Sequence, residues 1–406
     1  MPTSGPIPTD KLGPRSARDT ARVPRSGDKA RDTARNLLLG RNWRVCMFAP
    51  GLELSGVTTA TLNLMHALGE TGSKVALCSP TGALIEAATA CCTRWIEAVP
   101  RPGLFARRRF RQVLDEFAPQ VLHAVAPLGV PAAFAAAAYT GLPLLASVFG
   151  VKRHELPAPG EKRIAGYIAS DQAVRERLRN DCNVGADQVS LLPPCAFPSR
   201  APVEHEIMNP RRQPVVGFVS PLTSPAGWRE FLDAALRVMS GGADCMFAIL
   251  GDGPQSPRVR ELVEERGMQQ RVVQVAHMFD YGRIWEPFDI IVIDSRQPAA
   301  ATMVMQAMAG GHPVVATEGG SVFGVIEDGQ DGLIAPRNNP EALAQRLLFL
   351  MQNPAERLRL ARAAFERIEE TCEESWVAGA LSAIYAAALA GEPLPKSFEG
   401  MKAAKR

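Results

Sequence analysis

The chain has 406 residues, of which 46% are hydrophobic and 21% are charged, and its formal net charge is +3. This length predicts two domains with separate cores, and the composition is that of an ordinary soluble globular protein. No apolar run reaches the roughly 18 residues that a membrane-spanning helix needs. The first ten residues lack the apolar core of a secretory signal, so we expect a cytoplasmic protein.

The amino-terminal segment is basic and holds few apolar residues. Residues 1–35 carry eight Lys or Arg against four Asp, so the positive charge is local and the rest of the chain is nearly neutral. This distribution argues against a general nucleic-acid-binding surface. We predict a disordered basic tail over 1–42, which is either an arm for acidic lipid headgroups or a partner, or simply a solvated tail.

Strands and helices alternate through the first half of the folded chain. A buried strand is expected at 44–49, and Gly56 opens an amphipathic helix with Leu62, Met65 and Leu68 at helical spacing. A glycine at such a strand-to-helix turn is weak evidence for phosphate binding, because glycine serves any tight turn. Further elements are expected at 74–78, 83–99, 132–139, 143–149, 164–170, 174–178 and 188–194.

An arginine-rich stretch interrupts this alternation. Five arginines between Arg101 and Arg111 surround Leu104, Phe105 and Phe110. A basic amphipathic helix of this kind can lie on an anionic membrane surface. The alternative is a plain surface helix whose arginines are in water.

A strand–loop–helix–strand unit at 290–316 is the most informative part of the second half. The strands are expected at 290–293 and 314–316, and the helix at 299–309. In a parallel sheet, the loops of such a unit lie at the carboxyl edge. Other elements of this half are expected at 214–220, 231–239, 246–250, 259–266, 272–275, 281–288, 339–351, 356–370 and 376–389.

The start of the helix at 299–309 is a candidate anion site. Its first backbone N–H groups, near Ala300, Ala301 and Thr302, have no partner within the helix and are suited to a diphosphate.

The sequence around this unit resembles a known family. It reads QAMAGGHPVVAT from Gln306 to Thr317, followed by Gly319-Gly320, Asp328-Gly329 and Asp331-Gly332-Leu333. This pattern is similar to the donor-binding core of glycosyltransferase family 4, whose members are retaining nucleotide-sugar transferases. The resemblance extends over about 44–389.

The resemblance implies an α/β protein of the GT-B fold, in which two Rossmann-like, doubly wound parallel-sheet domains face each other across a cleft. The expected acceptor domain is 43–204, joined by a carboxyl-terminal helix at 375–390. The expected donor domain is 212–372, and a mobile tail follows over 392–406.

The resemblance also implies where ligands bind. Acceptor or sugar contacts are expected from His123, Gly150 and Lys152. For Lys152 the alternative interpretation is that it belongs to a solvated loop. The implied donor-binding residues are Ser55, Gly56, Gly251, Asp252, Gly253, Ala300, Ala301, Thr302, Gln306, Gly319 and Gly320.

The chain departs from the family at the charged positions. A histidine, an arginine, a lysine and two glutamates of the family pattern are replaced by Phe149, Pro221, Ala226, Pro298 and Gln306. The catalytic residues are therefore unknown. Arg296, Arg229 and Lys152 are nearby cations that could substitute.

No cofactor or metal is expected, because the resembled fold usually positions a diphosphate without one and no Asp-x-Asp motif is present. Eight scattered cysteines without a Cys-x-x-Cys pair indicate reduced thiols. The nucleotide-sugar is a substrate, and the expected partner is a glycan or lipid-linked acceptor, with peripheral contact to the inner membrane face through the arginine-rich stretch.

These features favour a retaining glycosyltransferase of cell-envelope polysaccharide synthesis. The alternative is a catalytically silent GT-B relative that acts as a binding or scaffold subunit. A sugar-nucleotide epimerase is a weaker third interpretation, because the motif positions hold no carboxylate set to carry that reaction.

Overall fold

A computed structural model describes residues 42–98, 104–126, 131–150, 157–158, 161–209, 211–223, 225–275 and 283–398. Within them the side chains of residues 104, 106, 205, 225 and 226 are not described. Of the predicted tail over 1–42, only residue 42 lies within these ranges. Lys152 and residues 399–406 lie outside them.

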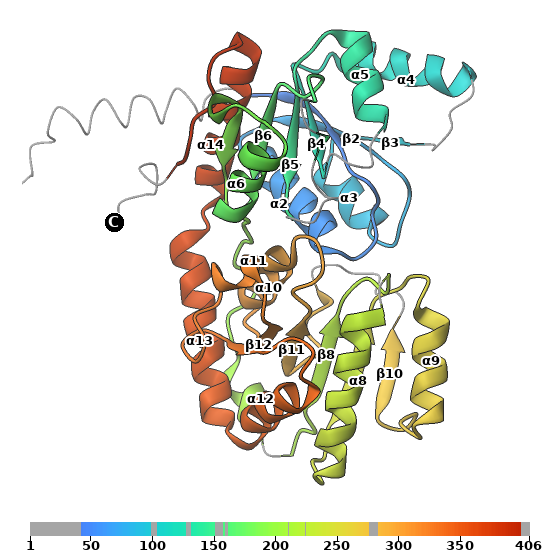
Figure 1. Ribbon diagram of the computed structural model, residues 1–406, viewed down its shortest axis with the longest axis vertical. Coiled ribbons are helices and arrows are strands. Elements are labelled where there is room, and N and C mark those ends of the chain that lie inside the picture. The colour runs from blue at the N-terminus through green and yellow to red at the C-terminus, as the bar shows by residue number, and fades with distance from the viewer. Residues whose placement is uncertain are drawn as a thin grey trace, which may run out of the picture. The chain divides into compact units, whose positions relative to one another are not determined.

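In the first half, the described strands form a seven-stranded parallel sheet with the order β3-β2-β1-β4-β5-β6-β7 (Figure 1). The order reverses between β1 and β4, which is the point where ligands bind in open α/β sheets. The strands are β1 (Arg44–Phe48), β2 (Lys74–Ser79), β3 (Arg94–Glu97), β4 (Val121–Val125), β5 (Leu144–Val148), β6 (Gly166–Ala169) and β7 (Val189–Leu191).

The second half repeats this design with six described strands in the parallel order β10-β9-β8-β11-β12-β13. Its order reverses between β8 and β11. The strands are β8 (Val215–Val219), β9 (Met246–Leu250), β10 (Val272–Val275), β11 (Ile290–Ile293), β12 (Val314–Thr317) and β13 (Leu333–Ala335). The two sheets confirm the predicted α/β class.

Helices connect the strands of both sheets. Those of the first half are α2 (Gly56–Glu70), α3 (Ile85–Cys91), α4 (Leu104–Phe117), α5 (Pro131–Thr140) and α6 (Gln172–Asp181). Those that follow are α7 (Glu204–Ile207), α8 (Pro225–Ser240), α9 (Ser256–Glu265), α10 (Ala300–Ala309), α11 (Gly320–Phe323), α12 (Pro340–Gln352), α13 (Pro354–Thr371) and α14 (Glu374–Ala390).

Helix α2 is not amphipathic as predicted. Most of its residues are buried, including Thr59 and Asn63 on the face expected to be polar. The reason is tertiary: α2 packs against α10 of the second half, against α14 and against α3 (Figure 1). One apolar core therefore contains residues of both halves.

Two local predictions are wrong. The described part of 281–288, where an element was expected, is a turn with no α-helix. The tail predicted to be mobile is docked over 392–398, where Leu394 and Phe398 are buried. The Leu394 N–H donates to the Asp187 carbonyl at 2.7 Å, so two apolar anchors and backbone hydrogen bonds hold this segment on the first half.

Candidate functional site

A cleft of about 730 Å³ lies between loops at the carboxyl edges of both sheets. The loops after β1 and β2 and the start of α3 contribute Glu53, residues 81–83, Ile85 and Glu86. The loops after β8 and β9 contribute Pro221, Thr223 and residues 252–254. This volume is within the range of about 300–1,000 Å³ that is usual for small-molecule sites. The predicted residues Pro221, Asp252 and Gly253 are thus brought together on its surface.

The charge of this cleft is negative. Its described lining contains the carboxylates Glu53, Glu86 and Asp252 and no lysine or arginine. The Asp252 carboxylate accepts hydrogen bonds from the Gly253 N–H at 2.8 Å and from the Ser256 hydroxyl at 2.6 Å. The lining therefore offers oriented acceptors for hydroxyl groups but no cation for a diphosphate.

The glycines after β9 have a structural role. Gly251 and Gly253 have φ angles of +150° and +152°, which residues with side chains rarely adopt. A β-carbon at Gly253 would lie 2.6 Å from the Leu222 carbonyl oxygen, and one at Gly251 would collide with the Ser220 carbonyl. The loops after β8 and β9 can pack this closely only because both residues are glycine.

The predicted anion site at the start of α10 is not exposed on the cleft. Ala300, Ala301 and Thr302 are buried, with exposed fractions of 0%, 2% and 0%. Gly56 at the start of α2 lies directly against the carbonyl groups of 298 and 299, and a β-carbon there would collide with the latter. Ser55 caps α2 by accepting a hydrogen bond from the Thr58 N–H at 3.2 Å.

Gln306 also faces the first half of the chain. Its side-chain oxygen accepts a hydrogen bond at 3.2 Å from the Asn63 amide, which also donates to the Cys195 carbonyl at 2.6 Å. Gly319 packs so closely against Ser295 that a β-carbon at position 319 would lie 2.5 Å from the Ser295 β-carbon. Gly320 has open space at that position and begins α11.

A buried ionic cluster adjoins the start of α8, and two of its members were missed by the sequence analysis. Arg296 donates to Asp294 at 2.7 Å, to Glu230 at 2.6 Å and to Asn338 at 3.0 Å. Asp294 and Glu230 are 1% and 5% exposed in their side chains. The signal for Asp294 was an acidic residue directly after an apolar strand. Arg296, proposed as a substitute cation, is already paired.

The second Asp294 carboxylate oxygen has no hydrogen-bond partner among the described residues. It points at Gly227 in the first turn of α8, where a β-carbon would collide with it. Arg229, the other described substitute cation, is exposed and lies over the Trp228 ring at 5.0 Å.

Two of the predicted sugar-contact residues lie on or just after the neighbouring strands β4 and β5: His123 within β4 and Gly150 after β5. His123 is fully buried in β4, and burial lowers the pKa of its imidazole to about 4. Phe149, after β5, lines a small cavity beside Ser147, and Gly150 follows it. His123 does not line that cavity itself. Its Nε2 lies 2.8 Å from the hydroxyl of Ser147, which does.

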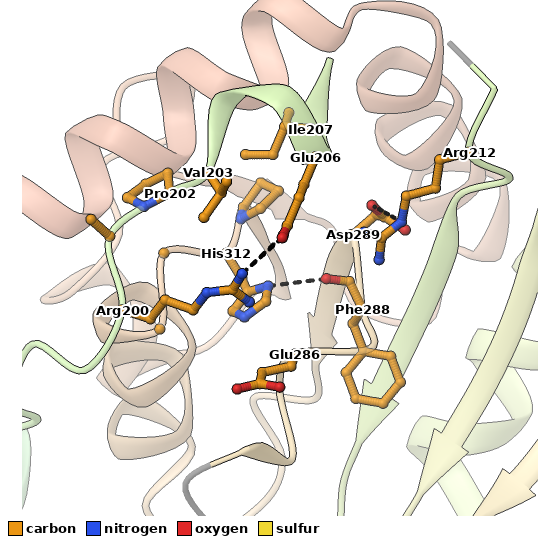
Figure 2. Close-up of a pocket in the computed structure, with 14 residues that line it drawn as sticks. Arg200, Pro202, Val203, Glu206, Ile207, Arg212, Glu286, Phe288, Asp289 and His312 are labelled. Carbon is orange, nitrogen blue, oxygen red and sulfur yellow. Dashed lines mark hydrogen bonds and ion pairs between the residues drawn. The ribbon is translucent and has the colours of Figure 1, made fainter. Parts of the chain in front are cut away.

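A further pocket lies at the amino edge of the second sheet, away from the cleft (Figure 2). Figure 2 shows Arg200 paired with Glu206, at 2.9 Å, beside His312, whose Nδ1 is 3.0 Å from the Phe288 carbonyl. Arg212 pairs with Asp289 at 3.2 Å. The cavity of about 30 Å³ holds little more than a water molecule, so we assign it a structural role.

The described residues contain no helix that is long and apolar enough to cross a membrane. Groups of three or more His, Cys, Asp or Glu placed to hold a metal ion are absent from the same residues.

Family models match both halves of the chain. A model described as Glycosyltransferase Family 4 matches residues 54–200, and one described as Glycosyl transferases group 1 matches residues 213–353. The chain is a GT-B protein of the glycosyltransferase family 4 type. Apart from β1, the strands of this family 4 protein's two sheets lie within the two matched regions.

Individual relatives are more distant. The alpha-D-kanosaminyltransferase of Streptomyces kanamyceticus is 27% identical, over 52% of this chain and 50% of the relative. The putative colanic acid biosynthesis glycosyltransferase WcaL of Escherichia coli K12 is 26% identical, over 54% and 53%. The chain thus spans about half the length of these curated relatives.

A solved structure supports the fold of the family 4 protein. HepE from Anabaena, in complex with UDP and glucose, has a TM-score of 0.68 and 13% identity, and the match covers 84% of this chain and 98% of HepE. This similarity shows the GT-B fold alone.

Proposed function

We propose that the protein is a retaining glycosyltransferase that moves a sugar from a nucleotide-sugar donor to a glycan or lipid-linked acceptor in cell-envelope polysaccharide synthesis. The observation that carries this proposal is the cleft between the carboxyl-edge loops of both sheets. Support comes from relatives named as glycosyltransferases, one of them assigned to colanic acid biosynthesis, and from HepE, which was solved with UDP and glucose.

Within the cleft, Asp252 is our candidate for holding the donor's ribose. Its carboxylate is oriented by the Gly253 N–H and the Ser256 hydroxyl, and carboxylates in Rossmann-like sites accept hydrogen bonds from ribose hydroxyls. The acidic lining gives little help to a departing diphosphate. Because one such electrostatic donor typically contributes about 3 kcal/mol to lowering the barrier, we expect slow turnover.

We also propose peripheral contact with an anionic membrane surface through α4. Arg107, Arg108, Arg109 and Arg111 belong to this helix, and Phe105 at its start is 91% exposed. Exposed cations together with an exposed aromatic ring are typical of a helix that lies in a lipid interface.

A catalytically silent binding or scaffold subunit is the second candidate, and two observations favour it. Helix α2 covers the start of α10, where the donor diphosphate was expected, and Arg296 is neutralised by Asp294 and Glu230. The first feature covers backbone N–H groups and the second neutralises a cation, and a donor diphosphate would need such groups to be free.

Calorimetric titration with UDP-, GDP- and ADP-sugars tests the proposal. We expect saturable binding of one nucleotide class, weakened at least tenfold by Asp252→Ala because an oriented acceptor is lost. Glu70→Gln, an exposed substitution at the far end of α2, serves as the control and should leave the affinity unchanged. Absence of binding by a folded sample would instead support the silent subunit.

A further inference from the structure

One face of α2 is hydrogen-bonded to one face of α10. The Thr59 hydroxyl donates to the Met303 sulfur at 3.2 Å, and the Asn63 amide donates to the Gln306 side-chain oxygen at 3.2 Å. Positions 59 and 63 are four apart and positions 303 and 306 are three apart, so each pair lies on one side of its helix. We call this row of bonds the α2–α10 contact.

The α2–α10 contact covers the start of α10. At one end of the contact, Gly56 lies directly against the carbonyl of Ala299, the residue before the helix. The first residues of the helix, Ala300 and Ala301, are buried behind it. A ligand therefore reaches the start of α10 only when α2 moves away.

The covered helix start keeps groups that need a partner. The residue before the helix is Ala299, so it has no side-chain cap, and the first turn contains no acidic residue. The Thr302 hydroxyl is fully buried and has no hydrogen-bond partner among the described residues. Because a helix start carries partial positive charge on its N–H groups, these features suit an anion.

The bonds of the α2–α10 contact are weak ones. They join neutral groups, and the thioether sulfur of Met303 is a poor acceptor, so each bond contributes little once water competes for it. Helix α10 has no charged residue, so no ion pair links it to α2. Asn63 has a shorter bond, at 2.6 Å, to the Cys195 carbonyl in the segment between the two sheets. Separating the helices thus breaks few strong interactions.

We propose that the α2–α10 contact is autoinhibitory: when closed it covers the start of α10, and when open it exposes Thr302 and the helix start to the diphosphate of a nucleotide-sugar. This inference rests on the proposed function, because the ligand is the proposed donor. The observed affinity for the donor is then the intrinsic affinity multiplied by the fraction of open molecules. Thr59 and Asn63, which hold the contact closed, therefore set how tightly the donor binds.

The first measurement is calorimetric titration of Thr59→Val with inorganic pyrophosphate and with UDP-, GDP- and ADP-sugars. Valine keeps the shape of threonine and removes the hydroxyl that bonds Met303, so the open fraction should rise. We expect the affinity for pyrophosphate and for one nucleotide class to increase roughly three- to tenfold, as one hydrogen bond predicts. Unchanged or weaker affinity for both probes would overturn the inference.

Thr61→Val is the matched control for this measurement. Thr61 is as buried as Thr59 in the same helix, but its hydroxyl donates to the Val57 carbonyl at 2.8 Å, within α2. Loss of that bond should leave both affinities at the wild-type values. A gain equal to that of Thr59→Val would mean that general loosening of the fold, and not release of α10, exposes the ligand site.

The second measurement closes the contact covalently. Thr59→Cys combined with Met303→Cys places two thiols where these side chains already meet, so mild oxidation should join them in a disulfide, identified by mass spectrometry of the linked peptides. The oxidised protein should bind pyrophosphate and nucleotide-sugar at least tenfold more weakly than the same sample reduced with dithiothreitol. Failure of the two thiols to join, or equal affinity in both forms, would contradict the inference.

Pyrophosphate separates this inference from the proposed function, because its binding needs no site for a sugar or a base. Tighter pyrophosphate binding in Thr59→Val, with no nucleotide-sugar bound by any form, supports the inhibitory contact and refutes the transferase. A nucleotide-sugar bound equally by the oxidised and reduced forms refutes the inhibitory contact and leaves the transferase standing. Absence of binding of every probe to every form refutes both.

Discussion

At the scale of single residues, two buried histidines make the free energy of unfolding sensitive to acid. Burial lowers the pKa of both His123 and His312 to about 4, from an ordinary value near 6.5. Between those values the unfolded chain takes up protons that the folded chain excludes, so stability falls as the pH falls from 6.5 towards 4. Above pH 6.5 both states are neutral and the effect vanishes.

We expect the free energy of unfolding to drop by roughly 4 kcal/mol between pH 7 and pH 5, about half from each histidine. Urea unfolding at the two pH values measures this drop, and His123→Gln should reduce it by about half. An unchanged pH dependence in that variant would show that His123 is not kept neutral by the fold.

Glycine 56 is the residue on which the contact between α2 and the loop before α10 depends. Gly56→Ala places a methyl group into the Ala299 carbonyl, a backbone atom that cannot rotate away, so we expect a loss of about 1–3 kcal/mol. Gly69→Ala is a matched control in the same helix, because its β-carbon meets nothing within 4 Å. This control should stabilise by about 0.5–1 kcal/mol through helix propensity.

Equal stability of the two variants in urea unfolding would contradict the close packing of α2 on the second half. A stable Gly56→Ala protein with altered donor binding would place that glycine at the ligand instead.

At the scale of elements, the ionic cluster at the start of α8 connects that helix to the loop after β11. Arg296→Met leaves Asp294 and Glu230 buried without their cation, so we expect destabilisation of about 3–5 kcal/mol. Arg229→Met on the exposed face of α8 is the control and should change stability by less than about 0.5 kcal/mol. A fully stable Arg296→Met protein that has lost donor binding would show that the cation serves the ligand.

Most strands and helices could be predicted because their apolar pattern is strong, as a continuous apolar run in β9 and β11 and as helical periodicity in α12. Helix α2 was misjudged because its polar face, with Asn63 and Thr59, is buried by elements far away in sequence. The docked segment after α14 was missed for the same reason. Leu394 and Phe398 are too few to form a periodic pattern, and only the tertiary structure provides their pocket.

At the scale of the whole molecule, the motif that identified the family also located the carboxyl edge of the second sheet. It did not predict which residues of that edge reach the cleft. Gly253 and Asp252 do, whereas Ala300 and Thr302 are covered by α2. The packing of one half against the other decides this exposure, and a pattern within one half carries no information about it.

The most direct measurement of the central claim is release of nucleoside diphosphate from UDP-, GDP- and ADP-sugars by the full chain. A functioning cleft predicts slow release from one nucleotide class, lost in Asp252→Ala and retained in Glu70→Gln. No release above background from any donor, by a folded protein and with methyl α-glucoside present as acceptor, would contradict a transferase and identify the chain as a silent member of its family.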